Sequence, residues 1–335
     1  MKSRRPCPPV QEKPIKRSLQ LIIGLIISGI GLYFSFRDVD VLMIMKGMWR
    51  AKVSLVVLSA GLYGVAFIFR SIRWQFLLKP LGKISLTRVF FALMFGFFVN
   101  EILPLRVGEV ARAMLIAGWM SIPLTASVGT IVAERLGDLS ILFIVCLLVS
   151  LGLPNANLPT KPLALTLLIA ALLCSVSVRR AETLIASEAR NPWMKKSIRA
   201  LGRFLLGLRQ IGDVRNASKL FASSVGVWTF DLLAMNVLGR AYGLSLSAAG
   251  TGALIIGIAI GVMLPAAPGY IGTYEYFGEK TLRLVGVPTQ VALTYVVSLH
   301  FLQMIMIALF GLPVLIRFGI PQMKPHKSAH TDQGG

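Results

Sequence analysis

Two apolar stretches of the sequence carry the same short pattern, Leu-Pro-x-x-x-Gly, with a carboxylate after it. Proline and glycine interrupt helices, and a helix broken inside a bilayer persists only where its freed backbone lies against protein or lines a cavity. Paired breaks in the two halves of a membrane protein are typical of transport sites. We call residues 97–112 the first motif and residues 261–275 the second motif. The pattern comprises Pro104, Gly108 and Glu109 in the first motif and Pro265, Gly269 and Glu275 in the second.

Charged groups near these breaks could bind a polar ligand. A helix that begins at Gly108, and another that begins late in the second motif, would have unpaired N–H groups and positive dipole ends near mid-membrane, which attract anions. Arg106 and Arg112 add formal positive charge, and a guanidinium matches the oxygens of a phosphate. The competing interpretation is structural, with Glu109 in the first helical turn paired to Arg112 three residues later.

A second group of charges lies between the two motifs. Glu134 and Asp138 are four residues apart and therefore share a helix face, with Arg135 beside them. Two buried like charges are unfavourable unless a cation or a proton intervenes. They could bind an arginine of the first motif, bind a cationic headgroup or relay protons; the alternative is a static network. Asp231 is alone in its apolar run, so we expect it to pair across helices.

The composition indicates a membrane protein. The 335 residues are 55% hydrophobic with a mean hydropathy of +0.73, and several apolar runs approach the roughly 20 residues that cross a bilayer. The net charge of +21 could indicate a nucleic-acid partner, but the basic residues lie in short connections between apolar runs, as the positive-inside rule predicts. Three cysteines and three histidines lack metal-ligand spacing, and no P-loop motif is present, so we expect no metal and no cofactor.

The distribution of basic residues predicts the path of the chain. The connections around 1–17, 70–88, 179–219 and 317–327 are rich in Lys and Arg, whereas 37–52, 154–161 and 243–247 are poor. The rich set should face the cytoplasm, together with both termini. Region 86–118 must then begin and end on the cytoplasmic side of the membrane, and region 247–287 must begin and end on the outer side. The predicted full spans are 18–36, 53–78, 122–153, 162–178, 218–240 and 289–317.

The predicted fold is therefore an all-α polytopic membrane protein with about six full spans plus two re-entrant broken-helix hairpins, 86–118 and 247–287, arranged as an inverted repeat. A basic cytoplasmic tail, 1–17, precedes a single transmembrane domain, 18–318, and a polar cytoplasmic tail, 319–335, follows it. Within the cytoplasmic connection 179–217, the pattern of Trp193–Ile211 predicts a basic amphipathic helix on the inner leaflet, or else a solvated linker. Val39–Arg50 should lie at the outer surface.

A combination of motif residues carries a family resemblance: Asn100, Pro104, Arg106, Gly108, Glu109 and Arg112, then Glu134, Arg135 and Asp138, then Pro265, Pro268, Gly269, Gly272 and Glu275. It resembles the lysylphosphatidylglycerol synthase transmembrane, or flippase-like, family over residues 18–318. Tyr270 departs from the pattern, because many members have glycine there. The resemblance implies a bilayer domain that binds or moves polar lipids. Members fused to a soluble aminoacyl-transfer domain make and flip lysyl-lipid, whereas this chain is expected to be a stand-alone member without that activity.

These considerations predict a lipid translocase or lipid-binding transporter of the bacterial inner membrane rather than an enzyme. The motif residues named above should bind the substrate, a polar phospholipid or an isoprenoid-derived lipid, since stand-alone members resemble proteins proposed to move hopanoids or similar lipids. Membrane lipids are the expected partners, and no nucleic acid is expected. Binding to proteins of a lipid-synthesis pathway and formation of a homo-oligomer are further options. The alternatives are an integral-membrane enzyme acting on a lipid-linked substrate through Glu134 and Asp138, and an accessory protein of an envelope pathway.

Overall fold

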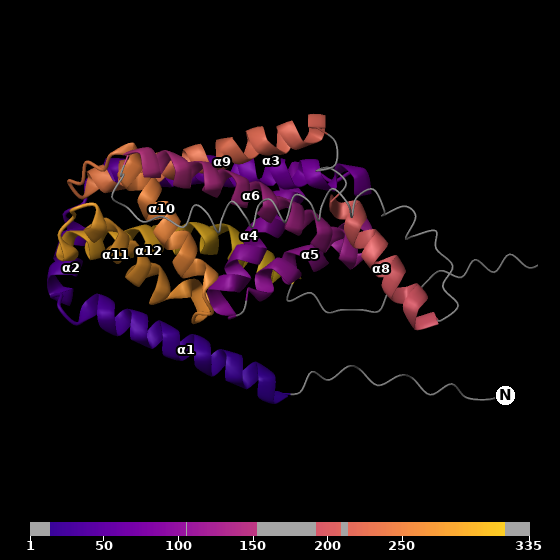
Figure 1. The fold of residues 1–335 in the computed structure, drawn as a ribbon, viewed down its shortest axis with the longest axis horizontal. Coiled ribbons are helices and arrows are strands. Elements are labelled where there is room, and N and C mark those ends of the chain that lie inside the picture. Colours follow the sequence, from indigo (N-terminus) through magenta and orange to yellow (C-terminus); the bar gives the residue numbers. More distant parts are fainter. Residues whose placement is uncertain (1–13, 105, 153–191, 209–213, 319–335) are drawn as a thin grey trace, which may run out of the picture.

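The computed structural model describes residues 14–104, 106–152, 192–208 and 214–318, and regular structure within these ranges is entirely helical. Figure 1 shows an elongated bundle with α1 along its outside. The prediction of an all-α chain is confirmed for this part. The helices are α1 (Pro14–Phe36), α2 (Val41–Trp49), α3 (Val53–Leu78), α4 (Leu86–Ile102), α5 (Val107–Met120), α6 (Leu124–Gly152), α8 (Pro192–Leu208), α9 (Val214–Ala241), α10 (Ala248–Met263), α11 (Thr273–Leu284) and α12 (Thr289–Phe318), with short 3-10 turns η1 (Lys79–Leu81) and η3 (Pro268–Tyr270).

Three of the described helices are long and apolar enough to cross a membrane, and they cover Val53–Leu81, Arg215–Ala241 and Thr289–Arg317. A fourth candidate is the pair α1–α2, in which the two helices are bent by 80°. The bend occurs where we expected the chain to turn onto the outer surface. The predicted span 162–178 lies outside the described residues, so the number of six spans stays a prediction.

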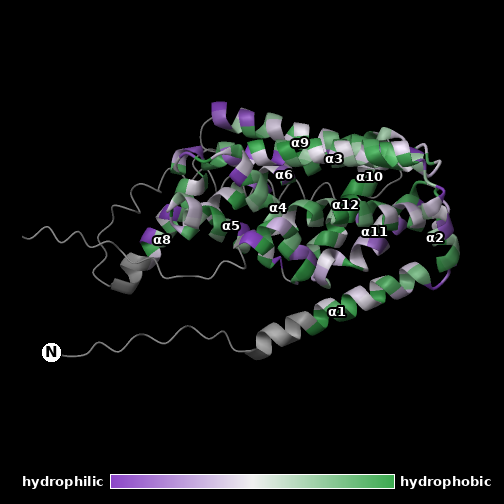
Figure 2. Cartoon of the chain, turned by 180° about the vertical axis from the view of Figure 1, so that it is seen from behind, coloured by the Kyte–Doolittle hydropathy of each residue, from purple (hydrophilic) through white to green (hydrophobic). Residues whose placement is uncertain are grey.

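The outward faces of the helices are apolar. Large hydrophobic side chains such as Leu25, Tyr33, Val53 and Leu309 are more than half exposed. Figure 2 shows hydrophobic colour along most of the helices, α1 included. A water-soluble protein rarely exposes continuous apolar surface on this scale, whereas lipid tails cover it in a membrane protein.

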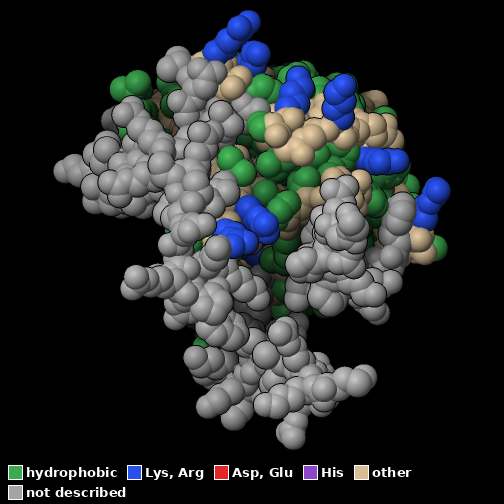
Figure 3. Space-filling model, turned by 90° about the vertical axis from the view of Figure 1, so that its right-hand side faces the viewer, with side chains coloured by type: hydrophobic (Ala, Val, Ile, Leu, Met, Phe, Trp, Pro, Cys, Tyr) green, Lys and Arg blue, Asp and Glu red, His purple; other side chains and the backbone are tan. Residues whose placement is uncertain are grey.

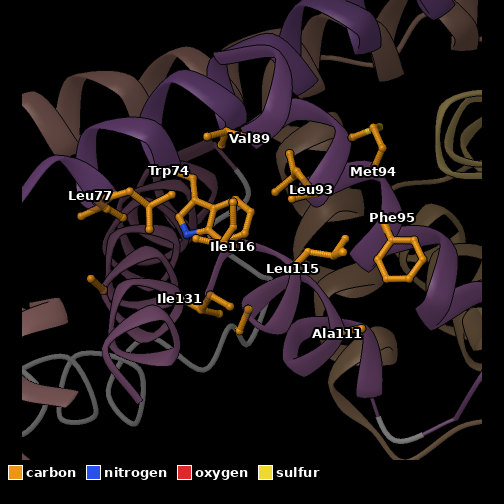
Figure 4. Packing of buried hydrophobic residues seen from close by; sticks show 14 of the residues in the cluster. Trp74, Leu77, Val89, Leu93, Met94, Phe95, Ala111, Leu115, Ile116 and Ile131 are labelled. Carbon is orange, nitrogen blue, oxygen red and sulfur yellow. The ribbon is translucent and has the colours of Figure 1, made fainter. Parts of the chain in front are cut away.

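A hydrophobic cluster joins the first half of the bundle. Trp74 of α3 is fully buried and packs with residues of α4, α5 and α6, including Leu93, Ile116 and Ile131 (Figure 4). The indole Nε1–H of Trp74 donates to Thr130 Oγ1 at 3.0 Å, so its polar edge is satisfied inside the core. This cluster sets the positions of α4 and α5, which carry the first motif.

The first motif forms a helical hairpin. The helices α4 and α5 pack against each other, and the chain reverses between the end of α4 at Ile102 and the start of α5 at Val107. Gly96 and Gly108 face each other so closely that a Cβ on Gly108 would overlap the carbonyl oxygen of Gly96. Asn100 Oδ1 accepts a hydrogen bond of 2.7 Å from the Gly108 N–H, which is one of the unpaired donors at the start of α5.

The second motif also forms a helical hairpin, from α10 and α11. Its break contains η3 and two glycines with left-handed backbone, Gly269 at φ 67° and Gly272 at φ 96°. The helix α1 covers this break: a Cβ on Gly31 would lie 2.7 Å from the Gly272 carbonyl oxygen, and Ser28 Oγ accepts from the Ala267 N–H at 2.7 Å. The backbone freed by the break is therefore buried in protein, as a broken membrane helix requires.

The two hairpins point toward each other. From their breaks, α5 extends toward the end of the bundle that carries α8, and α11 extends toward the end that carries α2 (Figure 1). This is the arrangement that an inverted pair would have. The membrane sides from which the hairpins enter, and the inverted repeat itself, stay predictions.

The end of the bundle near α8 is basic. Figure 3 shows lysine and arginine side chains on this face, and no acidic side chain of the described residues is visible there. One part of the charge count is wrong: Arg70 and Arg73 lie within α3 rather than in a connection, and Arg73 is only 1% exposed. These two cations can lie inside the bundle because carboxylates of neighbouring helices pair with them.

The amphipathic connection is a helix in its described part. Leu205 and Leu208 of α8 are buried, and Gly207 lies against the backbone of Gly129 in α6. Arg199 and Arg203 are exposed on the other face. The interpretation as a solvated linker is therefore wrong for Pro192–Leu208, since this helix packs on α6; its position at the inner leaflet stays a prediction.

Candidate functional site

A cavity of about 300 Å³ lies inside the bundle, between the two hairpins. Its lining comes from α3, α4, α5, α6, α9, α10, α11 and α12 and from η3. Four of the predicted site residues line it: Asn100, Arg106, Glu109 and Arg135. The wall carries both signs of charge together with aromatic side chains, a lining that suits a polar group attached to an apolar molecule.

A smaller cavity of about 180 Å³ lies between the two breaks themselves. Pro104 and Pro265, one from each motif, both line it. Asn100, Arg106 and Tyr270 line both cavities, so these three side chains form the wall between them. The predicted meeting of the two motifs therefore occurs at this wall.

Arg106 connects the two hairpins directly. Its backbone is left-handed, at φ 54°, and its guanidinium Nη2 donates to the carbonyl oxygen of Val262. Because α10 ends at Met263, that carbonyl has no helical N–H to accept from, and a cation is favourable at a helix C-terminus. The same guanidinium lies 6.0 Å from the centre of the Tyr270 ring. The predicted anion-binding arginine thus has a resident partner in the opposite hairpin.

The sequence spacing would allow Glu109 and Arg112 to pair with each other. In the structure, each of them pairs with another residue. Glu109 Oε1 lies 3.7 Å from Arg135 Nε, on the edge of the larger cavity. Arg112 Nη1 lies 3.2 Å from Glu134 Oε2, and its guanidinium is 4.7 Å from the Trp74 ring centre. Glu109 does lie in the first turn of α5, as the structural interpretation had it, but the Glu109–Arg112 ion pair is wrong, because the two side chains contact different residues of α6.

Glu134 is the centre of a buried ionic network. It is 0% exposed and contacts three arginines: Arg112, Arg73 at 3.1 Å and Arg135 at 3.0 Å. The option that these acids bind an arginine of the first motif is confirmed by the Arg112 contact. Neither Glu134 nor Arg112 lines the two cavities, so they support the wall from behind.

Asp138 extends the same network toward α3 and α9. Its carboxylate lies 2.6 Å from Arg73 Nη1 and 3.3 Å from Arg135 Nη1, and it accepts a hydrogen bond of 3.3 Å from Trp228 Nε1. Arg73 also donates to Ser224 Oγ at 3.0 Å. Burying a charge is costly unless it is paired, and the charges of this network are paired between α3 and α6, although Arg73 Nε has no hydrogen-bond partner in the described part of the chain.

Asp231 pairs across helices, as we expected. Its two carboxylate oxygens accept from the two terminal nitrogens of Arg70, at 3.1 Å and 2.5 Å. This fork geometry is the strongest arrangement for an arginine and a carboxylate. Both residues line the larger cavity, on the side of α3 and α9.

Glu275 of the second motif caps its own helix. One oxygen accepts from the Gly272 N–H at 2.6 Å, and the other lies 2.6 Å from His300 Nδ1 in α12. Tyr274 stacks on the His300 ring at 4.1 Å and donates to Gln303 Oε1 at 3.0 Å. The remaining predicted residues of this motif, Pro268, Gly269 and Gly272, shape the break around that cap.

Several residues of the site were not among those predicted from the sequence. Arg70 and Arg73 were counted as connection charges, although their spacing of three inside an apolar helix places them on one face. Glu101 and His300 line the larger cavity. Their occurrence as ionisable residues in apolar sequence was the available signal. Among the described residues, no group of three or more His, Cys, Asp or Glu side chains could hold a metal ion.

Fold and site together define a class: a multi-pass helical membrane protein with a charged cavity between two broken helix pairs. Within that class, the chain belongs to the family described as the lysylphosphatidylglycerol synthase TM region, whose model matches residues 21–311. The match covers nearly the whole chain and confirms the resemblance carried by the two motifs. No curated protein matches the chain.

Proposed function

We propose that this protein binds the headgroup of a polar lipid in the larger cavity and transfers that lipid between the leaflets of the bacterial inner membrane. The observation that carries the proposal is the cavity of about 300 Å³ between the two hairpins. A headgroup is polar and its tails are apolar, which matches a charged cavity inside a bundle whose outer faces are apolar.

Arg106 is the side chain best placed to bind an anionic part of the headgroup. It lines both cavities and, in the described part of the chain, has no carboxylate within ion-pair distance. A phosphate would offer its guanidinium a better acceptor than the neutral carbonyl of Val262. Asn100 and Tyr270, which share the wall, would add hydrogen-bonding groups to a headgroup that passes from one cavity to the other.

The proposed substrate is a phospholipid or an isoprenoid-derived polar lipid, and proteins of the same lipid pathway are proposed partners. In the alternative hypothesis of an integral-membrane enzyme, Glu134 and Asp138 would be the reacting carboxylates. Both are held by arginines and neither lines the two cavities described above, so the geometry favours the transporter. We also propose that the basic end near α8 and both termini face the cytoplasm, because positive residues are retained on that side.

A headgroup-accessibility assay in proteoliposomes tests this function. Purified protein is reconstituted with a trace of fluorescently labelled phosphatidylglycerol, and an impermeant reductant reports the fraction of label in the outer leaflet over time. We expect wild-type protein to accelerate exchange and Arg106→Ala to lower the rate at least about tenfold, since about 1.5–3 kcal/mol is typical of a charged hydrogen bond. Arg106→Lys should be intermediate because it keeps the charge but loses the fork.

The matched control is Arg37→Ala, which removes an arginine that lies outside both cavities and pairs with exposed Asp38. Its rate should equal that of the wild type. Equal rates for wild type and Arg106→Ala, or no acceleration above empty vesicles by any lipid of this class, would contradict the proposal.

A further inference from the structure

Glu101 is an acidic residue of the cavity that makes no ion pair in the described part of the chain. Its Oε2 is buried and makes no hydrogen bond to any described residue, and no arginine or lysine of the described chain lies within ion-pair distance. The other acids around the bundle centre have basic partners: Glu109 with Arg135, Glu134 with three arginines, Asp138 with Arg73, Asp231 with Arg70 and Glu275 with His300.

Its position is the junction of the two hairpins. Glu101 belongs to the last turn of α4, lines the larger cavity and faces the second break, where a Cβ built on Gly269 would lie 2.9 Å from its Oε2. Any movement of one hairpin against the other therefore changes the surroundings of this carboxyl group.

The charged and titratable groups around Glu101 already have partners. Arg106, the residue before α5, donates to the Val262 carbonyl, and His300 from α12 is held by Glu275 of α11. Tyr270 from η3 lies beside Arg106. The more distant cavity charges are the pairs Glu109–Arg135, from α5 and α6, and Arg70–Asp231, from α3 and α9. Among the described residues, His300 is the one basic group near enough to act on an ionised Glu101, and its Nδ1 is already paired with Glu275.

An isolated ionised carboxylate in an apolar surrounding is unfavourable by several kcal/mol, and such a group takes up a proton instead. We infer that Glu101 is a proton-binding site, and that its protonation couples the lipid transfer proposed above to the proton gradient across the membrane. With the hairpins packed as here, Glu101 carries a proton. When the hairpins separate and water enters, the proton passes from Oε2 to water and the carboxylate is hydrated. This inference rests on the proposed function for its coupling step.

The proton itself can be detected without any transport. A protonated carboxylic acid has an infrared carbonyl band that a carboxylate lacks, so purified protein in lipid nanodiscs is titrated from acid to alkaline pH by infrared difference spectroscopy. We expect a band at neutral pH that disappears in Glu101→Gln. The matched control is Glu279→Gln, a buried glutamate in α11 with Lys280 and Arg283 nearby, which should keep the band. A neutral-pH band unchanged by Glu101→Gln would overturn the inference.

The coupling is measured in the same proteoliposomes under an imposed pH gradient. For one proton per lipid, a gradient of one unit should shift the steady-state ratio of lipid between leaflets by up to about tenfold, since one unit is a tenfold ratio of proton activity. Glu101→Gln, which mimics the protonated form, should equilibrate lipid without responding to the gradient, and Glu279→Gln should respond like the wild type. An equal gradient response in Glu101→Gln would overturn the coupling. Wild-type protein that moves no lipid would contradict the proposed function, while the infrared result decides the proton site separately.

Discussion

At the scale of single residues, arginines determine what the buried carboxylates can do. Glu134 touches three arginines from α3, α5 and α6 and is fully buried. An acid held in this way stays ionised and fixed, so it supports the cavity wall. Glu101, which lacks such a partner among the described residues, is the carboxyl group free to exchange a proton.

Because Glu134 contacts three arginines, we expect its replacement by a neutral residue to lower the free energy of unfolding. In Glu134→Gln the buried guanidinium groups of Arg73 and Arg112 and the partly exposed one of Arg135 lose a shared counter-ion, and breaking a buried pair in this way typically costs about 3–5 kcal/mol. We expect a markedly lower unfolding midpoint in mixed micelles, measured by intrinsic fluorescence during denaturant titration. Asp38→Asn, at an exposed ion pair, is the control and should leave the midpoint unchanged. A midpoint equal to that of the wild type in Glu134→Gln would show that the network is not structural.

At the scale of elements, the two hairpins depend on glycines at close backbone contacts. Gly96 against Gly108 brings α4 and α5 together, and Gly261 against the Thr273 carbonyl brings α10 and α11 together. Small residues allow helices in a membrane to approach closely enough for packing to hold them. The same principle applies to α1, which contacts the second break through Gly24 and Gly31.

Because α1 contacts the second break, we expect alanine substitutions at two glycines of α1 to have different effects on stability. A Cβ on Gly31 would lie 2.7 Å from the Gly272 carbonyl oxygen, whereas a Cβ on Gly29 would meet nothing within 4 Å. Gly31→Ala should therefore displace α1 from the second break and lower stability by about 1–3 kcal/mol, as overpacking does. Gly29→Ala, the matched control, should be neutral or slightly stabilising, because alanine favours helix. Thermal unfolding in detergent compares the two, and equal melting temperatures would contradict the assigned α1 contact.

At the scale of the whole molecule, the two ends of the bundle differ in their acidic residues. The end near α8 shows lysine and arginine on its surface, whereas the end near α2 carries acids as well, such as Asp38 and Asp40. In a bacterial inner membrane the basic end should be retained in the cytoplasm. That orientation would place α4–α5 on the cytoplasmic side and α10–α11 on the outer side.

This orientation predicts which surface cysteines react from outside the cell. In a variant without native cysteines, Asp38→Cys at the α2 end should react with an impermeant maleimide on spheroplasts. Lys83→Cys, before α4, should react only after the membrane is permeabilised. Both positions are exposed, so accessibility in the folded protein does not separate them. Labelling of Lys83→Cys in intact spheroplasts would reverse the orientation.

Much of the fold could be read from the sequence because its causes are local. The lengths of the apolar runs predict helices that can cross a bilayer, and proline and glycine interrupt helices wherever they stand. Residues 86–118 and 247–287 were accordingly predicted as broken hairpins, and the structure has the helix pairs α4–α5 and α10–α11 there. The family followed from the same motifs and is confirmed by the match over residues 21–311.

The ionic partners could not be read from the sequence, because they depend on the rotation and packing of helices that are distant in the chain. Arg70 pairs with Asp231 across 161 residues, and Arg73 binds Asp138 across 65. Local spacing instead suggested the pair Glu109–Arg112, which does not form. The sequence by itself determined the class of protein and the positions of the two breaks. Only the tertiary structure decided which carboxylates are held by arginines and that Glu101 faces the cavity without an arginine or lysine partner in the described chain.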